Sequence, residues 1–458
     1  MLPEKFVEKM KKLLGEEYPD FEAALENEDA VRGLRINTLK CTCESFLKES
    51  DLPLSRVSYT DTGFILNSSE QVGRLAEHHS GRIYMQDPGA MAPISAVDIP
   101  SGSKVVDLCA APGGKSGQAA AMIGEDGFLL SNEFVAKRAK ILVSNFERLG
   151  IRNAIVTSMD TGELLELFNE YFDYAIVDAP CSGEGMFRKN DLASEEWSEE
   201  NVILSAKRQK EILANAARLV REGGYIIYST CTYAPEENEM IIDDFLSSHP
   251  GFSPVPAPQK IIDVTSAAIT ENTNQNNTEH CRRFYPHISS GEGQFLAIIR
   301  KNSSDMTTNV CKDASNPISK QDMAIVTDFL KTTLKSIPDA RIARVGENVV
   351  LLPSSIPAVP SHSVFMAGVL LGEIQKGRLI PSHQFFSAYG DLFKLQIELS
   401  QFPDKLDAYL SGEEIASPEK TENGYCAVTY KGSSLGGGKI SSGKIKNHYP
   451  KGLRNRKI

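Results

Sequence analysis

Short apolar runs alternate with longer amphipathic stretches through the middle of the chain. The longer stretches at 134–149 and 201–221 have the period of helices. The apolar runs are rich in β-branched and aromatic residues and predict strands at 103–109, 128–133, 153–158, 172–178 and 224–230. Strands and helices that alternate in this way predict an α/β fold with a doubly wound parallel sheet.

The regions on either side of this alternation have different patterns. An amphipathic helix at 6–14 and a strand-like piece at 33–38 predict a small α+β module. Near the other end, a helix at 320–335 and short strands at 349–352 and 364–371 predict a β-rich region. The predicted organisation is an N-terminal module at 1–95, the sheet domain at 96–301, a linker at 302–318 and a C-terminal region at 319–458.

The net charge of −11 is unevenly distributed along the chain. From Lys431 to Ile458 there are eight basic residues and no acidic ones, so the rest of the chain is more acidic than the net charge indicates. An acidic body with a basic end can bind a polyanion locally. The alternative is a frayed, solvated tail, as basic termini often are, and the charge pattern leaves both open.

The eight cysteines are scattered, and no pair has the Cys-x-x-Cys spacing of a redox or zinc site. We therefore expect a reduced, cytoplasmic protein with neither disulfides nor a metal site. No apolar stretch approaches the roughly 20 residues that cross a membrane, and the N-terminus lacks a signal-peptide pattern. A membrane partner is therefore not expected.

Two of the cysteines occupy matching places in the pattern. Cys181 follows the predicted strand that ends at Asp178, and Cys231 directly follows the predicted strand at 224–230. The carboxyl ends of neighbouring parallel strands meet at one edge of a sheet, where ligands bind. Two thiols and a carboxylate at that edge predict covalent chemistry rather than packing.

The turn after the first strand, from Cys109 to Ser116, is rich in glycine and leads into a helix. A phosphate-binding P-loop requires glycine where Cys109 stands, and the dinucleotide pattern GxGxxG does not fit the glycine spacing. Carboxylates at Glu133, Asp160 and Asp178 follow the next three strands. This set fits an adenosine without phosphate, as in S-adenosylmethionine. The alternative is that they are helix caps or surface carboxylates.

Three segments resemble the motifs of the Sun-type RNA cytosine-5 methyltransferases. They are DLCAAPGGK at 107–115, DAPCSGEG at 178–185 and STCT at 229–232. Segments similar to the ribosomal-RNA branch of that family, typified by RsmF, lie at 283–287, 291–295 and 446–454. The resemblance covers essentially the whole chain.

The resemblance implies a Rossmann-like class I methyltransferase domain that uses S-adenosylmethionine, an RNA-binding N-terminal module and a PUA-like RNA-binding C-terminal region. It implies that Cys231 is the nucleophile, that Cys181 assists product release and that Asp178 lies beside the target cytosine. It implies that the cofactor is bound by Cys109, Ala110, Ala111, Pro112, Gly113, Gly114, Lys115, Glu133, Arg138, Asp160 and Asp178. The expected substrate is ribosomal RNA, with 16S rRNA favoured.

The chemistry of cytosine explains why such a site needs thiols. Carbon 5 is a poor nucleophile until a thiolate adds to carbon 6, and cysteine both attacks and leaves well. Asp178 can serve the N3 edge if burial beside the base favours its protonated form. Arg188 and Lys189 are candidates for holding phosphates beside a base that has left its stack, or else an ordinary solvated pair. Trp197 is expected in the core rather than as a stacking platform.

Two other functions remain open at this point. A transfer-RNA methyltransferase would use the same chemistry on another substrate, and a non-catalytic ribosome-assembly factor would keep only the fold. The intact set of Cys181, Cys231 and Asp178 argues against the second. A DNA methyltransferase would attack with Cys181 and would not need Cys231, so DNA is not an expected partner. We expect a monomer that acts on RNA.

Overall fold

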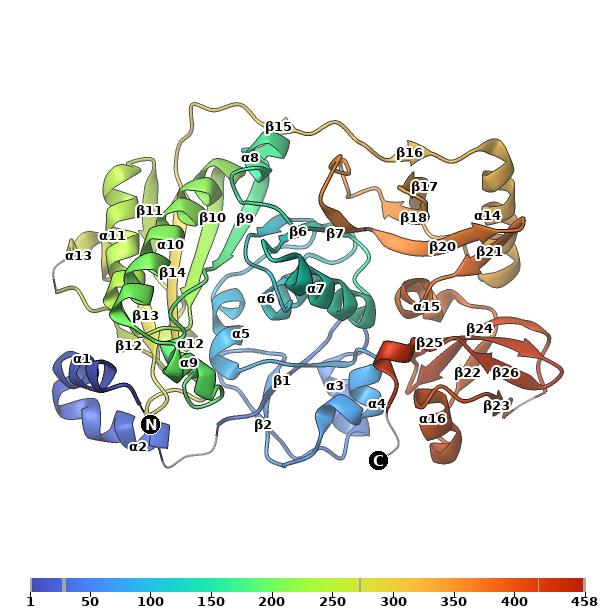
Figure 1. Ribbon diagram of the computed structural model, residues 1–458, viewed down its shortest axis with the longest axis horizontal. Helices are drawn as coiled ribbons and strands as arrows, with labels where there is room; N and C mark the ends of the chain where they lie inside the picture. The colour runs from blue at the N-terminus through green and yellow to red at the C-terminus, as the bar shows by residue number, and fades with distance from the viewer. Residues whose placement is uncertain (1, 27–29, 272, 419, 456–458) are drawn as a thin grey trace.

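A ten-stranded sheet forms the centre of the molecule (Figure 1). The computed structural model describes residues 2–26, 30–271, 273–418 and 420–455. Five parallel strands lie in the order β7 (Ala154–Thr157), β6 (Phe128–Asn132), β5 (Lys104–Asp107), β9 (Phe172–Asp178) and β10 (Val220–Thr230). The prediction of a doubly wound parallel sheet is therefore confirmed.

Antiparallel strands extend the parallel sheet at both edges. At one edge β14 pairs with β10, and two further strands pair with different halves of β14. The strands at this edge are β11 (Phe252–Val255), β12 (Ser266–Ala267), β13 (Arg282–Phe284) and β14 (Gln294–Lys301). At the opposite edge, β19 (Val364–Ala367) pairs with β7.

Helices cover both faces of the sheet because successive residues of a strand point to opposite sides. The helices on one face are α5 (Pro88–Ser95), α6 (Gly114–Ile123) and α7 (Ala136–Leu149). The helices on the other face are α8 (Leu164–Leu167), α10 (Glu199–Leu219) and α11 (Glu239–Ser248). In β5, Val105 faces the first group and Val106 faces the second, and both are fully buried. Burial on both sides explains the unbroken apolar sequence of these strands.

The N-terminal residues form two helices and a separate four-stranded sheet. The helices are α1 (Glu4–Leu14) and α2 (Tyr18–Glu26), and they pack through Phe6 and Phe21 against Trp197 and Tyr233. The sheet has the order β2 (Leu54–Arg56), β3 (Gly63–Leu66), β1 (Gly33–Ile36) and β4 (Ile83–Met85), with the short helices α3 (Cys43–Glu49) and α4 (Ala76–His79). The helix expected at 6–14 and the strand expected at 33–38 are both present.

Two five-stranded sheets follow the central domain. The first has the order β16 (Asn316–Pro317), β17 (Ala340–Val345), β18 (Asn348–Pro353), β20 (Val369–Gln375) and β21 (Arg378–Pro381). The second has the order β22 (Gln396–Glu398), β24 (Gly424–Tyr430), β25 (Ser433–Ser441), β26 (Lys444–Asn447) and β23 (Ile415–Ala416). Their helices are α14 (Lys320–Thr333), α15 (His383–Tyr389) and α16 (Pro403–Leu410).

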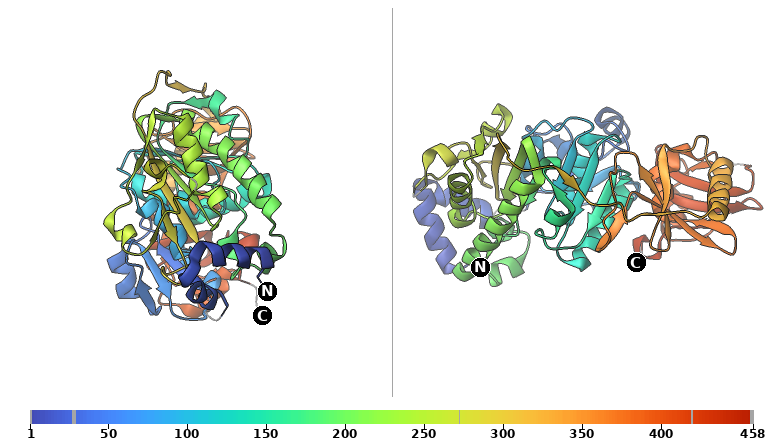
Figure 2. Two further views of the ribbon diagram at one scale, coloured as in Figure 1. Left: turned by 90° about the vertical axis from the view of Figure 1, so that its left-hand side faces the viewer. Right: turned by 90° about the horizontal axis from the view of Figure 1, so that it is seen from above.

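These sheets form one end of an elongated molecule, and α1 and α2 lie at the other end (Figure 2). Between the central sheet and the C-terminal sheets, the expected linker is not wholly irregular. Its short strand β15 (Asn309–Val310) pairs with β8 (Phe168–Asn169) of the central domain. In the described parts of the chain, no helix is both long enough and apolar enough to cross a membrane.

The sequence pattern predicts that the apolar run at 364–371 forms one strand of the C-terminal region. In the structure this run is divided between β19 and β20. Gly368 has a φ of +56°, and a Cβ atom there would lie 2.3 Å from the Leu351 carbonyl oxygen. The chain turns at this glycine, so β19 joins the central sheet and β20 joins the next sheet. The C-terminal region therefore contributes a strand to the central domain.

The basic C-terminal segment is folded as far as Asn455. Most of it forms β25 and β26, and the buried Tyr449 hydrogen-bonds His79 of α4 at 2.7 Å. The alternative of a frayed, solvated tail is therefore wrong for these residues. Arg456 and Lys457 of the predicted basic tail lie outside the described residues.

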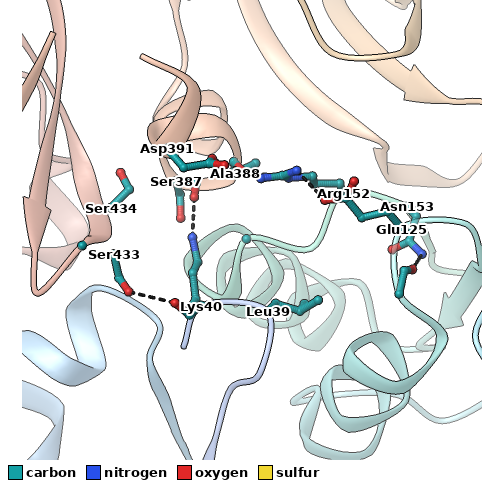
Figure 3. Close-up of a pocket in the computed structure, with 13 residues that line it drawn as sticks. Leu39, Lys40, Glu125, Arg152, Asn153, Ser387, Ala388, Asp391, Ser433 and Ser434 are labelled. Carbon is teal, nitrogen blue, oxygen red and sulfur yellow. Dashed lines mark hydrogen bonds and ion pairs between the residues drawn. The ribbon is translucent and has the colours of Figure 1, made fainter. Parts of the chain in front are cut away.

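Lys40 joins three parts of the chain beside a cavity of about 220 Å³ (Figure 3). Its ammonium donates to the Ser387 carbonyl in the last turn of α15. It also lies at the end of α7, because a Cβ atom at Gly150, the residue after that helix, would be 2.6 Å from Lys40 Nζ. Two helix C-termini therefore face one cation, which their dipoles stabilise.

Candidate active site

Cys181 and Cys231 lie side by side at the carboxyl edge of the sheet. Their Sγ atoms are 3.4 Å apart. The proximity follows from the pairing of β9 with β10, in which Asp178 and Ser229 are register partners. The expectation that two thiols meet at one edge is therefore met, whereas the role of each thiol is a separate question.

The two thiols differ in their environment. A hydrogen bond with Cys231, followed by burial, raises the pKa of the Cys181 thiol well above its usual value. Cys181 is therefore protonated at neutral pH and can donate its S–H to the sulfur of Cys231. Their places in the chain also differ, because Cys181 stands three residues after Asp178 and Cys231 stands two residues after Ser229, the register partner of Asp178.

Asp178, the last residue of β9, is held from two sides. Its Oδ1 atom accepts a hydrogen bond of 2.8 Å from Ser229 Oγ and forms an ion pair of 2.8 Å with Lys115 Nζ. The side chain is 37% exposed, and that of Lys115 is 8% exposed. The burial on which the proposed protonation depends is therefore absent in the free protein and has to come from a bound base.

The glycine-rich turn is anchored to the sheet behind it. Asp107, at the end of β5, is buried and accepts a hydrogen bond of 2.6 Å from Ser116 Oγ at the start of α6. Burial raises the pKa of Asp107 to about 7. Gly113 has a φ of +111°, and a Cβ atom there would lie 2.9 Å from Leu142 Cδ1. This close approach to α7 is open only to glycine.

Glu133 and Arg138 connect the turn to the next strand. The buried Glu133 accepts a hydrogen bond of 3.0 Å from the Val135 amide and forms an ion pair of 3.4 Å with Arg138. Arg138 also donates to the Ala111 carbonyl at 2.8 Å. An oriented carboxylate beyond β6 fits the hydroxyl groups of a ribose, and the residues present therefore suit an adenosine ligand.

Asp160 lies at the same edge and also caps the turn that follows it. It is exposed, and its Oδ1 atom accepts a hydrogen bond of 2.8 Å from the Gly162 amide. This is the turn-capping contact that was the alternative to a ligand role. One carboxylate oxygen is thus committed to the turn after β7.

The side chain of Arg188 is buried, whereas Lys189 lies at the surface. Arg188 is 6% exposed and forms an ion pair of 3.0 Å with the buried Glu292, and it donates to the Ala24 carbonyl of α2 at 2.8 Å. Lys189 forms an ion pair of 2.6 Å with Asp87. The expectation of a solvated side chain is wrong for Arg188, because long-range packing encloses it, and the phosphate contact stays a prediction.

Two buried carboxylates lie beside the cysteines, one inside the motif at 178–185 but without an expected role and the other outside every motif. They are Glu184 and Glu237, and each accepts hydrogen bonds from the other cysteine's loop. Trp197 is buried as expected and donates its indole N–H to Glu184 at 3.0 Å. Among the described residues, no group of three or more His, Cys, Asp or Glu side chains is arranged to hold a metal ion.

Comparison with known proteins finds similarity along the whole chain. Family models match consecutive parts of it: the N-terminal domain of 16S rRNA methyltransferase RsmF at 2–88, 16S rRNA methyltransferase RsmB/F at 95–300, the first C-terminal domain of RsmF rRNA methyltransferase at 328–388 and the methyltransferase RsmF PUA domain at 395–455. Residues 301–327, which include β15 and β16, lie between the matched parts.

Individual relatives agree with the family models. Two proteins named ribosomal RNA small subunit methyltransferase F, from Vibrio vulnificus and Vibrio campbellii, are each 32% identical over 99% of this chain and 97% of their own length. A solved methyltransferase homolog from Pyrococcus horikoshii is 27% identical with a TM-score of 0.57, covering 65% of this chain and 95% of that one. This chain therefore belongs to the RsmF family and is an S-adenosylmethionine-dependent ribosomal RNA methyltransferase.

Proposed function

We propose that the enzyme methylates carbon 5 of a cytosine in 16S rRNA through a covalent bond between Cys231 and the base. The observation that carries this proposal is the pair of thiols 3.4 Å apart at the carboxyl edge of the sheet. Methyl transfer to a nitrogen or oxygen atom needs no thiol, whereas carbon 5 needs an attacking thiolate. The unequal environments of the two thiols support unequal roles.

In this proposal the Cys231 thiol loses its proton to a bound water, the thiolate forms a bond to carbon 6, and the electrons of the 5–6 double bond become available at carbon 5. S-adenosylmethionine supplies the methyl group. The proton on carbon 5 then leaves to a bound water, the 5–6 double bond re-forms, and the bond to Cys231 breaks with its electron pair returning to sulfur. Cys181 keeps its proton and donates a hydrogen bond through its S–H to the departing Cys231 thiolate. This role uses the raised pKa of Cys181, because a protonated thiol is a donor and not a base.

Asp178 serves the N3 edge of the cytosine in the same proposal. A base that stacks over the end of β9 would exclude water from the 37% of the side chain that is exposed. Desolvation favours the neutral carboxylic acid, which can donate a hydrogen bond to N3 and stabilise the adduct. Glu133, Arg138, Asp160 and the turn at 109–115 would hold the cofactor on the other side.

The remaining parts of the proposal concern the setting of the reaction. We assign RNA binding to the N-terminal module at 1–95 and to the C-terminal region at 319–458, which the linker at 302–318 joins to the domain at 96–301. The folded basic segment from Lys431 to Asn455 supports an RNA contact at that end. The enzyme would act as a monomer in the cytoplasm, without DNA or membrane partners.

The test uses labelled S-adenosylmethionine with separate 16S rRNA, 23S rRNA and transfer RNA, and compares the wild type with Cys231→Ala and Cys181→Ala. We expect label in 16S rRNA, recovered as 5-methylcytosine. Cys231→Ala should be inert, and Cys181→Ala should accumulate a protein–RNA adduct that survives denaturation. An adduct in Cys231→Ala would exchange the roles of the two thiols. Label in transfer RNA alone would favour that substrate, and label in no RNA would favour an assembly factor.

A further inference from the structure

We propose that Glu184 and Glu237 are positioning residues that form a reciprocal clamp between the two cysteine loops and set the distance between the thiols. The Cys181 loop is defined as residues 179–186 and the Cys231 loop as residues 231–238. Each loop contributes one buried carboxylate, and that carboxylate accepts hydrogen bonds from the other loop. The roles of the thiols in this inference rest on the proposed function, but the clamp itself does not.

Glu184 belongs to the Cys181 loop and holds the Cys231 loop. Its Oε2 atom accepts hydrogen bonds of 2.9 Å from Thr232 Oγ1 and of 2.9 Å from the Tyr233 amide. Trp197 donates to its Oε1 atom at 3.0 Å. The carboxylate is fully buried, so these donors replace the water that would otherwise solvate it. The residues directly after Cys231 are thereby fixed.

Glu237 belongs to the Cys231 loop and holds the Cys181 loop in the same way. Ser182 donates both its amide, at 3.0 Å to Oε2, and its hydroxyl, to Oε1. The buried Gln209 of α10 donates to Glu237 Oε2 at 2.8 Å and to the Pro180 carbonyl at 3.0 Å. Ser182, after Cys181, is therefore bound to Glu237, and Pro180, before Cys181, is bound to Gln209.

Direct contacts between the loops complete the clamp. Ser182, which binds Glu237, and Thr232, which binds Glu184, also contact each other, with 2.9 Å between Ser182 Oγ and Thr232 Oγ1. The Gly185 amide donates to the Cys231 carbonyl at 2.8 Å. A Cβ atom at Gly185 would lie 2.9 Å from that carbonyl oxygen, which explains why glycine is needed at this contact. The loops therefore move as one unit.

The partners of both carboxylates are hydrogen-bond donors. At Glu184 this arrangement makes Glu→Gln a sharp test, because the substitution keeps the shape of the side chain and places an NH₂ group against the N–H of Trp197 or of Tyr233, which cannot accept it. At Glu237 the hydroxyl of Ser182 could accept the NH₂ group, so Glu237→Leu, which removes both acceptors, is the test there. The loop held by the substituted residue should then shift, while the fold around it is kept.

The experiment compares Glu237→Leu and Glu184→Gln with Glu170→Gln in the full-length enzyme. Glu170 is a matched control, because it is a buried carboxylate paired with Lys301 and is remote from both cysteine loops. Without RNA, iodoacetamide labelling of Cys181 and Cys231 is followed by peptide mass spectrometry. With RNA, kcat, the KM for S-adenosylmethionine and the amount of denaturation-resistant adduct are measured.

We expect Cys181 to be labelled at least fivefold faster in Glu237→Leu than in the wild type, and kcat to fall at least tenfold with the KM within twofold. Glu237→Leu should accumulate adduct, because a misplaced Cys181 slows release, and Glu184→Gln should form less adduct, because Cys231 is misplaced. Ser182→Ala, which removes one donor, should shift labelling in the same direction as Glu237→Leu if that variant does not fold.

Labelling rates and kcat that match those of Glu170→Gln in both variants would overturn the clamp. A change in thiol labelling together with an active Cys231→Ala enzyme would keep the clamp and overturn the proposed function. The two failures are therefore distinguishable, because labelling needs neither RNA nor the methyl donor.

Discussion

Lys115 Nζ lies 2.8 Å from Asp178 Oδ1, so a single ion pair links the glycine-rich turn to the end of the strand that carries Cys181. The lysine side chain is almost enclosed, and the carboxylate faces the edge where a base would bind. In the proposed mechanism this ion pair would couple the cofactor side of the site to the RNA side. It also makes Lys115 a structural partner of Asp178.

Asp178→Asn should abolish most activity without unfolding the enzyme. Loss of the carboxyl group removes the proton donor at N3, and we expect kcat to fall by about 100-fold or more. The Lys115 ammonium loses its counter-charge, so the free energy of unfolding should fall by about 1–2 kcal/mol. Single-turnover methylation and urea unfolding measure the two effects. An asparagine variant with wild-type kcat would remove Asp178 from the proposed mechanism.

The reactivity of Cys181 should depend on the presence of Cys231. A raised thiol pKa keeps Cys181 neutral at pH 7–8, so alkylation of the wild type should become rapid only above pH 9. Cys231→Ala removes the hydrogen bond that is the largest cause of the shift. The alkylation profile of Cys181 should then move to lower pH, and its rate at pH 8 should rise. An unchanged profile would show that burial alone controls this thiol.

Cofactor affinity should separate the roles of Glu133 and Asp160. Glu133→Gln removes an acceptor for the ribose and weakens the Arg138 contact, so the Kd for S-adenosylhomocysteine should rise about tenfold, or 1.4 kcal/mol. Asp160→Asn keeps an oxygen for the Gly162 amide, so any loss of affinity reports on the ligand and not on the turn. Titration calorimetry measures both, with the exposed Glu166→Gln as the control. Equal affinities in all variants would exclude both carboxylates from the cofactor site.

Lys40→Met should weaken the contact of the N-terminal module with the ends of α7 and α15. Burial lowers the pKa of Lys40 to about 8, so its charge is retained at pH 7, between two helix C-termini. Loss of this charged hydrogen bond should reduce the free energy of unfolding by about 2 kcal/mol, measured in urea at pH 7. Lys48→Met, on the exposed side of α3, is the control. The advantage of the wild type should grow as the pH rises from 8 towards 10.5, because the folded form then releases a proton that the unfolded chain still holds.

Arg188→Ala should act on stability and not on RNA affinity. The substitution leaves the buried Glu292 without its arginine partner, and the free energy of unfolding should fall by about 3 kcal/mol. The slope of RNA affinity against salt concentration should stay unchanged, because no phosphate contact is removed. A shallower slope in this variant, measured by filter binding, would support the phosphate-binding interpretation.

The local pattern of the chain was sufficient for the parallel sheet and for the meeting of two thiols. Strand periodicity predicted β9 and β10 as neighbours, and neighbouring parallel strands must end at one edge, so Cys181 and Cys231 could be paired without coordinates. The glycine-rich turn after β5 could likewise be predicted, because a strand, glycines and a helix follow one another directly in the sequence.

Tertiary structure alone decided the contacts between residues that are far apart in the chain. Packing, which periodicity does not record, folds the basic end onto α4 and buries the Arg188 side chain against Glu292. Packing also brings Glu184 and Glu237 each into hydrogen bonds with the other cysteine loop. The same holds for the turn at Gly368, which sends β19 into the central sheet. A repeating pattern of apolar residues reports which face of an element is buried, and only the folded chain determines what that face meets.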